Sequence, residues 1–380
     1  MTSSHPTPAP CQWFSRLASA LDRRSAPRLA LMFLGAVLAR GRRTVTAWIR
    51  AARLSDRFPS CYVAVAAAGK KADRIARCLL IDVVRPLLNG SARLTLALDD
   101  TPTKRYGPHV QGAGIHHNPT PGPAGSPYVY GHVFVVLAIL AAHPAWGGVA
   151  LPLLARLYVR KADLPGIAPK HRPPFRTKLE LAVELLRWAG PWLGLLGLPV
   201  WVVADGAYAK ADFLKPAMAL GMTVVSRLRK DAALRTVPGP RPAGKRGRPR
   251  IYGPDVIDLA RRGGQRRGWS TGTITLYGVA AVKKYKTFLA TWRPAGARPG
   301  GPGRRAGRLA GLLLHRHLRF GGRHPGGGRR PVRPGDRLPR VQAGRRRRPA
   351  AGAIPVGERG GVPHLPVDVH ADRGVGLGPG

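Results

Sequence analysis

The spacing of apolar and polar residues changes along this chain and divides it into distinct parts. Residues 1–12 are polar and contain several prolines, so we predict that they are disordered. Over residues 13–90 apolar residues recur at helical spacing, in FSRLASALDR, APRLALMFLGAVLARG, TVTAWIRAARL and ADRIARCLLIDVVRPLL. Thr44 precedes the third of these segments and is expected to cap it. We expect a helical bundle that binds DNA, although packing alone explains these helices equally well.

The next part of the chain, residues 91–296, is predicted to be a mixed α/β domain. Strand-like apolar runs alternate with two amphipathic helical segments; the strands are expected at 94–98, 128–140, 149–159, 199–205 and 222–229, and the helices at 177–190 and 209–221. The stretch 112–127 is rich in Gly and Pro and is predicted to be a loop. A strand pair is expected at 270–282 and 285–294. This order favours a mixed sheet flanked by helices.

One apolar stretch, residues 132–157, raises the question of a membrane span. His143, Pro144 and the Gly147-Gly148 pair divide it into two runs that are each too short to cross a bilayer, so two buried strands joined by a turn are predicted. The N-terminus lacks the apolar core of a signal peptide. Three scattered cysteines form neither a zinc motif nor a disulfide framework, which is typical of a cytoplasmic protein.

The charge of the chain indicates a polyanionic partner. The formal net charge is +45, and positive charge on this scale favours binding to nucleic-acid phosphates. The alternative is a solvated basic surface encoded by a GC-rich gene. The loop 238–254 carries Lys245, Arg246, Arg248 and Arg250 between Pro and Gly residues. Arg-Gly-Arg-Pro segments of this kind insert into the minor groove of A·T-rich DNA, although so short a motif also arises by chance.

Residues 297–380 differ in composition from everything before them. They contain no Lys, Trp, Tyr, Ser, Thr, Asn, Met or Cys, and consist largely of Gly, Arg, Pro, Ala, Val and Leu. A disordered Arg/Gly-rich tail that binds nucleic acid is one interpretation. A frameshift in a GC-rich gene is the interpretation that we favour. Codons can be chosen for residues 321–344 whose +1 frame reads AADILGAVADRFALETGFHEFKQV, a peptide with the helical periodicity that the written frame lacks.

Candidate chemistry lies where two predicted strands meet carboxylates. Asp99 and Asp100 follow the first strand, and Asp205 follows a second strand about a hundred residues later. Oxygen ligands at neighbouring strand ends suit a divalent cation such as Mg²⁺, which promotes phosphodiester cleavage and transfer. A phosphotransferase with a nucleophilic strand-end Asp is a competing interpretation, but its Asp-x-Asp spacing is absent. A third interpretation makes Asp99 or Asp100 a turn cap before Pro102.

The motifs LALDDTPTKRYG, GIHHNPTPG, YVYGH and VVADGAYAK together resemble the DDE transposases of bacterial insertion sequences, in particular the IS701-like branch of the IS4-type superfamily. The resemblance covers about residues 30–293. It implies an RNase H-like catalytic fold with a β-rich insertion, behind a helical DNA-binding region. It also implies an Asp-Asp-Glu triad that binds Mg²⁺ or Mn²⁺, with transposon ends and target DNA as partners. By motif, Asp100 and Asp205 correspond to the two Asp residues, and Asp99 is expected to support them.

The third carboxylate is where this chain departs from the family. The resemblance places a Glu on a helix well downstream, where the written frame has PGDRLPRVQAG, and neither Asp336 nor Glu358 lies in a helical pattern. Glu180 and Glu184 precede the second Asp strand and are therefore misplaced. We therefore expect a transposase that is inactive as written.

Several alternatives stay open. The first is an active enzyme with an unrecognised acidic ligand, and the second is a non-catalytic DNA-binding remnant. A homodimer is also open. His116 and His117 are expected to serve the loop rather than a metal ion, and Lys104 either contacts phosphate or is solvated.

Overall fold

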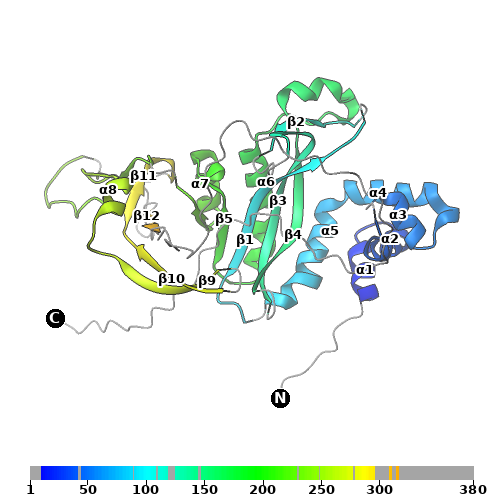
Figure 1. The fold of residues 1–380 in the computed structure, drawn as a ribbon, viewed down its shortest axis with the longest axis horizontal. Helices are drawn as coiled ribbons and strands as arrows, with labels where there is room; N and C mark the ends of the chain where they lie inside the picture. Colours follow the sequence, from blue (N-terminus) through cyan, green and yellow to red (C-terminus); the bar gives the residue numbers. More distant parts are fainter. Residues whose placement is uncertain are drawn as a thin grey trace, which may run out of the picture.

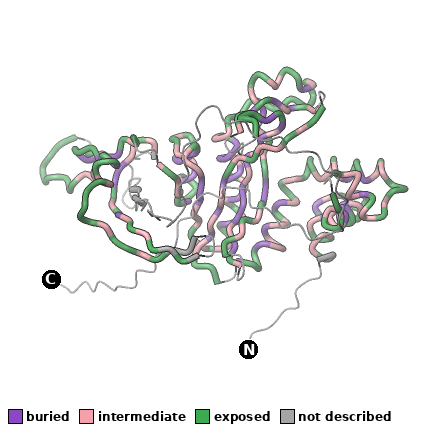
Figure 2. The backbone as a smooth tube through the Cα atoms, viewed as in Figure 1, coloured by how far each residue is buried: buried purple, intermediate pink, exposed green. Residues whose placement is uncertain are grey.

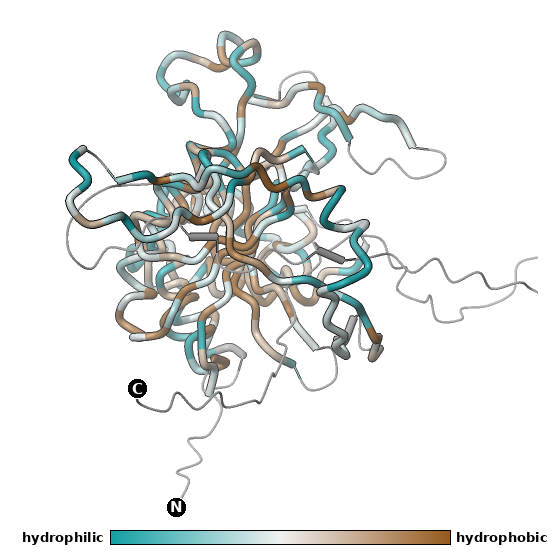
Figure 3. The backbone as a smooth tube through the Cα atoms, turned by 90° about the vertical axis from the view of Figure 1, so that its left-hand side faces the viewer, coloured by the Kyte–Doolittle hydropathy of each residue, from teal (hydrophilic) through white to brown (hydrophobic). Residues whose placement is uncertain are grey.

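Three regions lie side by side in the protein: a group of helices, a central sheet and a smaller β-rich region (Figure 1). A computed structural model describes residues 10–41, 44–88, 90–107, 110–118, 125–143, 147–228, 231–247, 249–276, 279–295, 308–309 and 314–315. Apolar segments gather in the centre of the molecule and hydrophilic segments lie toward its periphery (Figure 3).

The helical region begins earlier and contains one more long helix than the sequence pattern predicts. Its elements are α1 (Pro10–Ala18), α2 (Ala26–Leu38), α3 (Val45–Ala51), α4 (Phe58–Lys70) and α5 (Ala72–Cys78), and the chain continues through a π-helical turn (Leu79–Val84) and a 3₁₀ turn (Arg85–Leu88). Because α1 starts at Pro10, the prediction of disorder over 1–12 is wrong for its last residues, and residues 1–9 lie outside the described part of the chain. Helix α4 was not predicted.

Short polar contacts and a small core hold these helices together. The Thr44 hydroxyl accepts a hydrogen bond from the backbone N–H of Ala47 at 3.2 Å, which confirms the predicted cap of α3. Met32, Ile49 and Cys61 from α2, α3 and α4 are buried against one another. The three helices therefore share a core of their own, separate from that of the sheet.

The central sheet has the strand order and directions of the predicted RNase H-like class. Its strands are β1 (Leu94–Lys104), β2 (Gly114–His117), β3 (Tyr128–His143), β4 (Gly147–Tyr158), β5 (Val200–Ala204) and β6 (Thr223–Ser226). β3 pairs antiparallel with β1 and β4, whereas β5 is parallel to both β1 and β6. The hairpin β3–β4 confirms two strands over the apolar stretch 132–157. In the described part of the chain no helix is long and apolar enough to cross a membrane.

Helices cover one face of this sheet. Leu94, Leu96 and Leu98 are buried in a core that also takes residues from α5, α6 (Lys178–Gly194) and α7 (Ala211–Ala219). Side chains alternate between the faces of a strand, so Thr95 and Ala97 point to the opposite face, where both are half-buried. Figure 2 shows the buried positions concentrated in these central strands. The sheet therefore has one fully packed face and one that is less covered.

The β-rich insertion that the resemblance implies lies beyond β6. It comprises β7 (Leu234–Arg235), β8 (Val256–Ile257), α8 (Leu259–Gly264), β9 (Ser270–Leu276), β10 (Val279–Lys286) and β11 (Ala290–Trp292), followed by a 3₁₀ turn (Arg293–Ala295). Leu234, Ile257, Leu259 and Ala290 form its core. The prediction of one strand over 270–282 is wrong, because this range contains β9 and the first residues of β10, and these two strands pair antiparallel. Trp292 packs against both this core and that of the central sheet.

The predicted tail lies almost entirely outside the described residues. Within 297–380 only the two-residue strands β12 (Arg308–Leu309) and β13 (Leu314–His315) are described, and they pair with β11 and β10. Disorder is therefore wrong for these four residues.

A half-buried arginine links the helical region to the sheet. Arg156 on β4 forms two hydrogen bonds of 2.8 Å with the Asp73 carboxylate of α5, and its Nε donates to Glu184 of α6 at 2.7 Å. Only 19% of the Arg156 side chain is exposed. Arg176 also pairs with Glu184. Because a bidentate arginine pair fixes orientation as well as distance, Arg156 sets how α5 and α6 lie against β4.

Arg156→Met should destabilise the fold, because Asp73 and Glu184 would lose their shared cation in a partly buried place. We expect the free energy of unfolding in urea to fall by about 1–3 kcal/mol. Arg187→Met is the matched control, since Arg187 is an exposed residue of the same helix as Glu184, and its effect should stay within about 0.5 kcal/mol. Equal losses in the two variants would contradict the role assigned to Arg156.

Candidate active site

The two adjacent aspartates lie inside a strand rather than at its end. β1 continues to Lys104, and Asp99 and Asp100 pair with Val136 and Val135 of β3. On the other side, the pairing of β1 with β5 stops at Leu98 and Ala204. The interpretation of these residues as a turn cap before Pro102 is therefore wrong. What ends beside them is the neighbouring strand β5, and this leaves one side of β1 open at the two carboxylates.

Asp205 enters the same place from β5. It follows Ala204, the partner of Leu98, so it lies next to Asp99 across the two strands. Its carboxylate accepts a hydrogen bond from the backbone N–H of Ala207 and caps a 3₁₀ turn over Gly206–Tyr208. The Ser226 hydroxyl of β6 donates to the carbonyl oxygen of Asp205 at 2.8 Å. Capping and this second bond fix the backbone at the end of β5.

Asp100 faces the helices and forms an ion pair there. Strand alternation places it on the same face as Leu98, and the Nζ of Lys178 lies 2.5 Å from its Oδ2. Lys178 is the first residue of α6, directly after the cap Thr177. The two side chains are 38% and 27% exposed, for Lys178 and Asp100 respectively, so the pair stays open to solvent.

Like charges gather at this point. Desolvation by the surrounding protein raises the pKa of Asp99 above its ordinary value; the N–H of Asp100 opposes this, the Asp100 and Asp205 carboxylates raise the pKa further, and Lys178 lowers it. The phenol of Tyr208 is 1% exposed, and burial followed by the same three carboxylates raises its pKa. Both pKa values are raised by burial and by neighbouring carboxylates. Perturbed pKa values of this kind cluster at functional sites.

The donor chemistry of this cluster suits a hard divalent cation. Asp100 and Asp205 offer carboxylate oxygens from adjacent strands, as Mg²⁺ or Mn²⁺ requires. These two carboxylates are too few to form a complete metal site. In the described part of the chain, no three His, Cys, Asp or Glu side chains lie closely enough to hold a metal ion together. The residues therefore fit a metal ion in kind, with at least one ligand still to be supplied.

The other acidic residues considered from the sequence have structural roles or lie elsewhere. Glu180 completes a capping box with Thr177 at the start of α6, and Glu184 pairs with Arg156 and Arg176. Asp336 and Glu358 lie outside the described residues. The third carboxylate is thus unidentified within the described ranges.

The histidine pair lies on a strand, so the prediction of a loop over 112–127 is wrong for residues 114–117. β2 carries His116 and His117 and pairs with the beginning of β3. His116 is 8% exposed and its ring lies 6.2 Å from that of Tyr158. Burial, followed by Arg160, lowers the pKa of His116. Burial and Arg160 therefore both disfavour the charged form of this imidazole.

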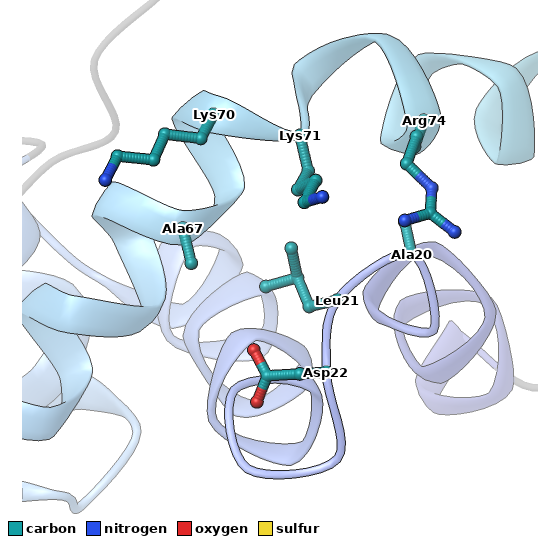
Figure 4. Close-up of a pocket in the computed structure, with 7 residues that line it drawn as sticks. All are labelled: Ala20, Leu21, Asp22, Ala67, Lys70, Lys71 and Arg74. Carbon is teal, nitrogen blue, oxygen red and sulfur yellow. The ribbon is translucent and has the colours of Figure 1, made fainter.

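Two basic surfaces lie away from the carboxylates. Lys245, Arg246 and Arg250 are exposed in the loop between β7 and β8, while Arg248 lies outside the described residues. A hollow in the helical region is lined by Ala20, Leu21, Asp22, Ala67, Lys70, Lys71 and Arg74 (Figure 4). Its lining includes three cations, Lys70, Lys71 and Arg74, and one carboxylate, Asp22. Both surfaces are suited to phosphate contacts.

Sequence reasoning missed two members of the site, Lys178 and Tyr208. Tyr208 belongs to the motif VVADGAYAK, where its spacing from Asp205 was visible. Lys178 lies far from both aspartates in sequence and had no local pattern to mark it. Only the packing of α6 against β1 brings it to Asp100.

Asp99→Asn should stabilise the fold at neutral pH. The raised pKa means that the folded state binds more protons than the unfolded state above the ordinary value of 3.8, so stability falls as pH rises through the folded-state pKa. An amide removes this penalty and keeps the acceptor for the Asp100 N–H. We expect a higher free energy of unfolding at about pH 7, with the gain vanishing in acid.

Asp212→Asn, at an exposed carboxylate in the first turn of α7, should show no such pH-dependent gain. A loss of stability in Asp99→Asn at neutral pH would contradict the assigned electrostatics.

Comparison of the sequence with models of known protein families gives one match over most of the described part of the chain. A family model described as DDE superfamily endonuclease matches residues 16–295, which include the helical region, the central sheet and the insertion. Endonucleases of this superfamily generally use divalent metal ions. No curated protein matches the chain.

Proposed function

This chain belongs to the DDE superfamily endonuclease family, and we propose that it is the transposase of a bacterial insertion sequence of the IS701-like branch. The observation that supports the proposal is the meeting of Asp100 and Asp205 at the end of the β1–β5 pairing. Mg²⁺ or Mn²⁺ as cofactor, transposon ends and target DNA as partners, and a cytoplasmic location belong to this proposal. A homodimer is part of it as well.

In the proposed reaction, Asp100 and Asp205 are the metal ligands contributed by the sheet. A divalent cation bound by such carboxylates activates the attacking hydroxyl and stabilises the leaving oxygen of a phosphodiester. Asp99 adds negative charge beside them, and its Oδ1 accepts a hydrogen bond of 2.8 Å from the backbone N–H of Asp100. Tyr208 is buried in the core next to these carboxylates, on the side of the sheet that the helices cover.

We further propose that the chain is inactive as written, because its third carboxylate is lost through a frameshift after about residue 296. The insertion ends at Trp292, and the next turn packs against α7, so the chain returns to the catalytic domain at the place where its composition changes. The half-buried face of β1 at Thr95 and Ala97 is consistent with a missing covering element. Two carboxylates alone hold a divalent cation weakly.

Nicking of supercoiled plasmid in Mn²⁺ tests this proposal. The chain as written should not nick, whereas a chain whose residues after 296 are replaced by the +1-frame sequence should. In the restored chain, Asp100→Asn or Asp205→Asn should reduce nicking by more than the roughly 10- to 100-fold that loss of an outer-shell partner costs. Asp212→Asn, at an exposed carboxylate, is the control and should retain activity. Metal-dependent nicking by the chain as written would instead favour an unrecognised acidic ligand.

A second candidate function is that of a non-catalytic remnant that occupies transposon ends. The exposed cations Lys245, Arg246 and Arg250 favour it, because phosphate binding does not depend on the metal site. The basic hollow around Lys70, Lys71 and Arg74 extends the same argument to the helical region. Binding to end sequences without cleavage would support this function.

Substitution of Arg246, Arg248 and Arg250 by Gln should weaken DNA binding and flatten its salt dependence. Each lost phosphate contact lowers the slope of log K against log salt by about 0.9 on duplex DNA. Titrations by fluorescence anisotropy at several salt concentrations measure that slope. An exposed arginine of another region, Arg187, supplies the control. Unchanged affinity and slope in the triple variant would exclude the loop as a DNA contact.

A further inference from the structure

Lys178 occupies a position that helix electrostatics alone does not favour. It is the first residue of α6, a helix of 17 residues. The N-terminus of a helix carries partial positive charge, so an ammonium group there is repelled by the helix dipole. The compensation comes from outside the helix, through the ion pair of 2.5 Å with Asp100 on β1.

The surroundings hold the ammonium at this place. Thr177 and Glu180 form a reciprocal capping box, with bonds of 2.7 Å and 3.2 Å, that fixes the first turn of α6. The Nζ of Lys178 also lies 5.5 Å from the centre of the Tyr158 ring on β4, within cation–π range. Lys178 is therefore positioned by its helix cap, by an aromatic face and by the carboxylate together.

Three arginines in this part of the fold already have acidic partners. Arg160 pairs with Asp163 at 2.6 Å, and Arg156 and Arg176 pair with Glu184. In contrast, the partner of Lys178 is Asp100, one of the two proposed metal ligands. The pair is partly exposed, so its exchange with an ion from solvent is sterically possible and electrostatically inexpensive.

We propose that Lys178 is a positioning residue that serves as the resident counter-cation of Asp100, and that its ammonium and the divalent metal ion compete for this carboxylate. The inference rests on the proposed role of Asp100 as a metal ligand. In the metal-free protein Lys178 neutralises Asp100 and keeps it from repelling Asp99 and Asp205. A bound metal ion takes over this neutralisation, and the ammonium leaves the Oδ2 atom.

Competition and a purely structural role predict opposite changes in metal affinity when the charge of Lys178 is removed. Removing the charge of Lys178 leaves Asp100 without its competitor and removes a positive charge that repels the metal ion, so the affinity for metal should rise. Loss of a structural contact would disorder the site and lower that affinity. Lys178→Met removes the charge and preserves the length of the side chain, whereas Lys178→Arg preserves the charge.

Binding of Mn²⁺ to the full chain, followed by the electron paramagnetic resonance signal of free Mn²⁺, measures this affinity without any need for activity. In Lys178→Met the Kd should fall about two- to fivefold, as expected from loss of a partly exposed ion pair. In Lys178→Arg it should stay within about twofold of the parent. Lys215→Met, at an exposed lysine of α7, is the matched control and should also leave the Kd unchanged.

An unchanged or higher Kd in Lys178→Met, with circular dichroism showing a folded protein, would overturn the proposal. If that variant does not fold, Lys178→Gln gives the same reading with a polar neutral side chain. Asp100→Asn distinguishes failure of this proposal from failure of the proposed role of Asp100 as a metal ligand. If Asp100→Asn leaves Mn²⁺ binding intact, the metal role of Asp100 fails. If Asp100→Asn abolishes binding and Lys178→Met does not strengthen it, only the competition fails.

Discussion

The parallel pairing of β1 with β5 is the constraint on which the rest of the site depends. It aligns Leu98 with Ala204 and thereby brings the carboxylates that follow each residue to one point, although they are about a hundred residues apart in sequence. Because β5 ends there while β1 continues along β3, the carboxylates lie beside an open edge instead of within a closed sheet. The core of Leu94, Leu96 and Leu98 beneath them supplies the rigidity that a charged cluster requires.

The helices serve this arrangement from one side. α6 brings Lys178 to Asp100, and the turn after β5 brings Tyr208 beneath the cluster. Arg156 on β4 bonds to Asp73 of α5 and to Glu184 of α6. These contacts attach the helical region, which contains the basic hollow, to the sheet. The opposite face of the sheet has half-buried positions at Thr95 and Ala97, so it is less covered than the helix side.

Much of this fold follows from local patterns, and the exceptions have identifiable physical reasons. The apolar periodicity predicted β3, β4, β5, β6, α6 and α7 with errors of a few residues at their ends, whereas β1 continues to Lys104, well beyond its predicted end at Leu98. Helix α4 was missed because Pro59 suggests a break, although proline is well tolerated in a first turn. β2 was missed because its pairing with β3 outweighs its Gly-rich surroundings. Asp100 and Asp205 were proposed from motifs, and the pairing of β1 with β5 brings them to neighbouring strands. The contact of Lys178 with Asp100, in contrast, exists only after α6 packs on the sheet.

The central claim is that a DDE endonuclease core is interrupted before its third carboxylate. The nucleotide sequence across codons 290–380, read in all three frames, tests it most directly. The account predicts that the +1 frame continues beyond about codon 296 as an open, patterned sequence with a Glu on an amphipathic helix. If no alternative frame is open and patterned, the Arg/Gly-rich tail is genuine, and the explanation of the missing ligand by a frameshift is wrong.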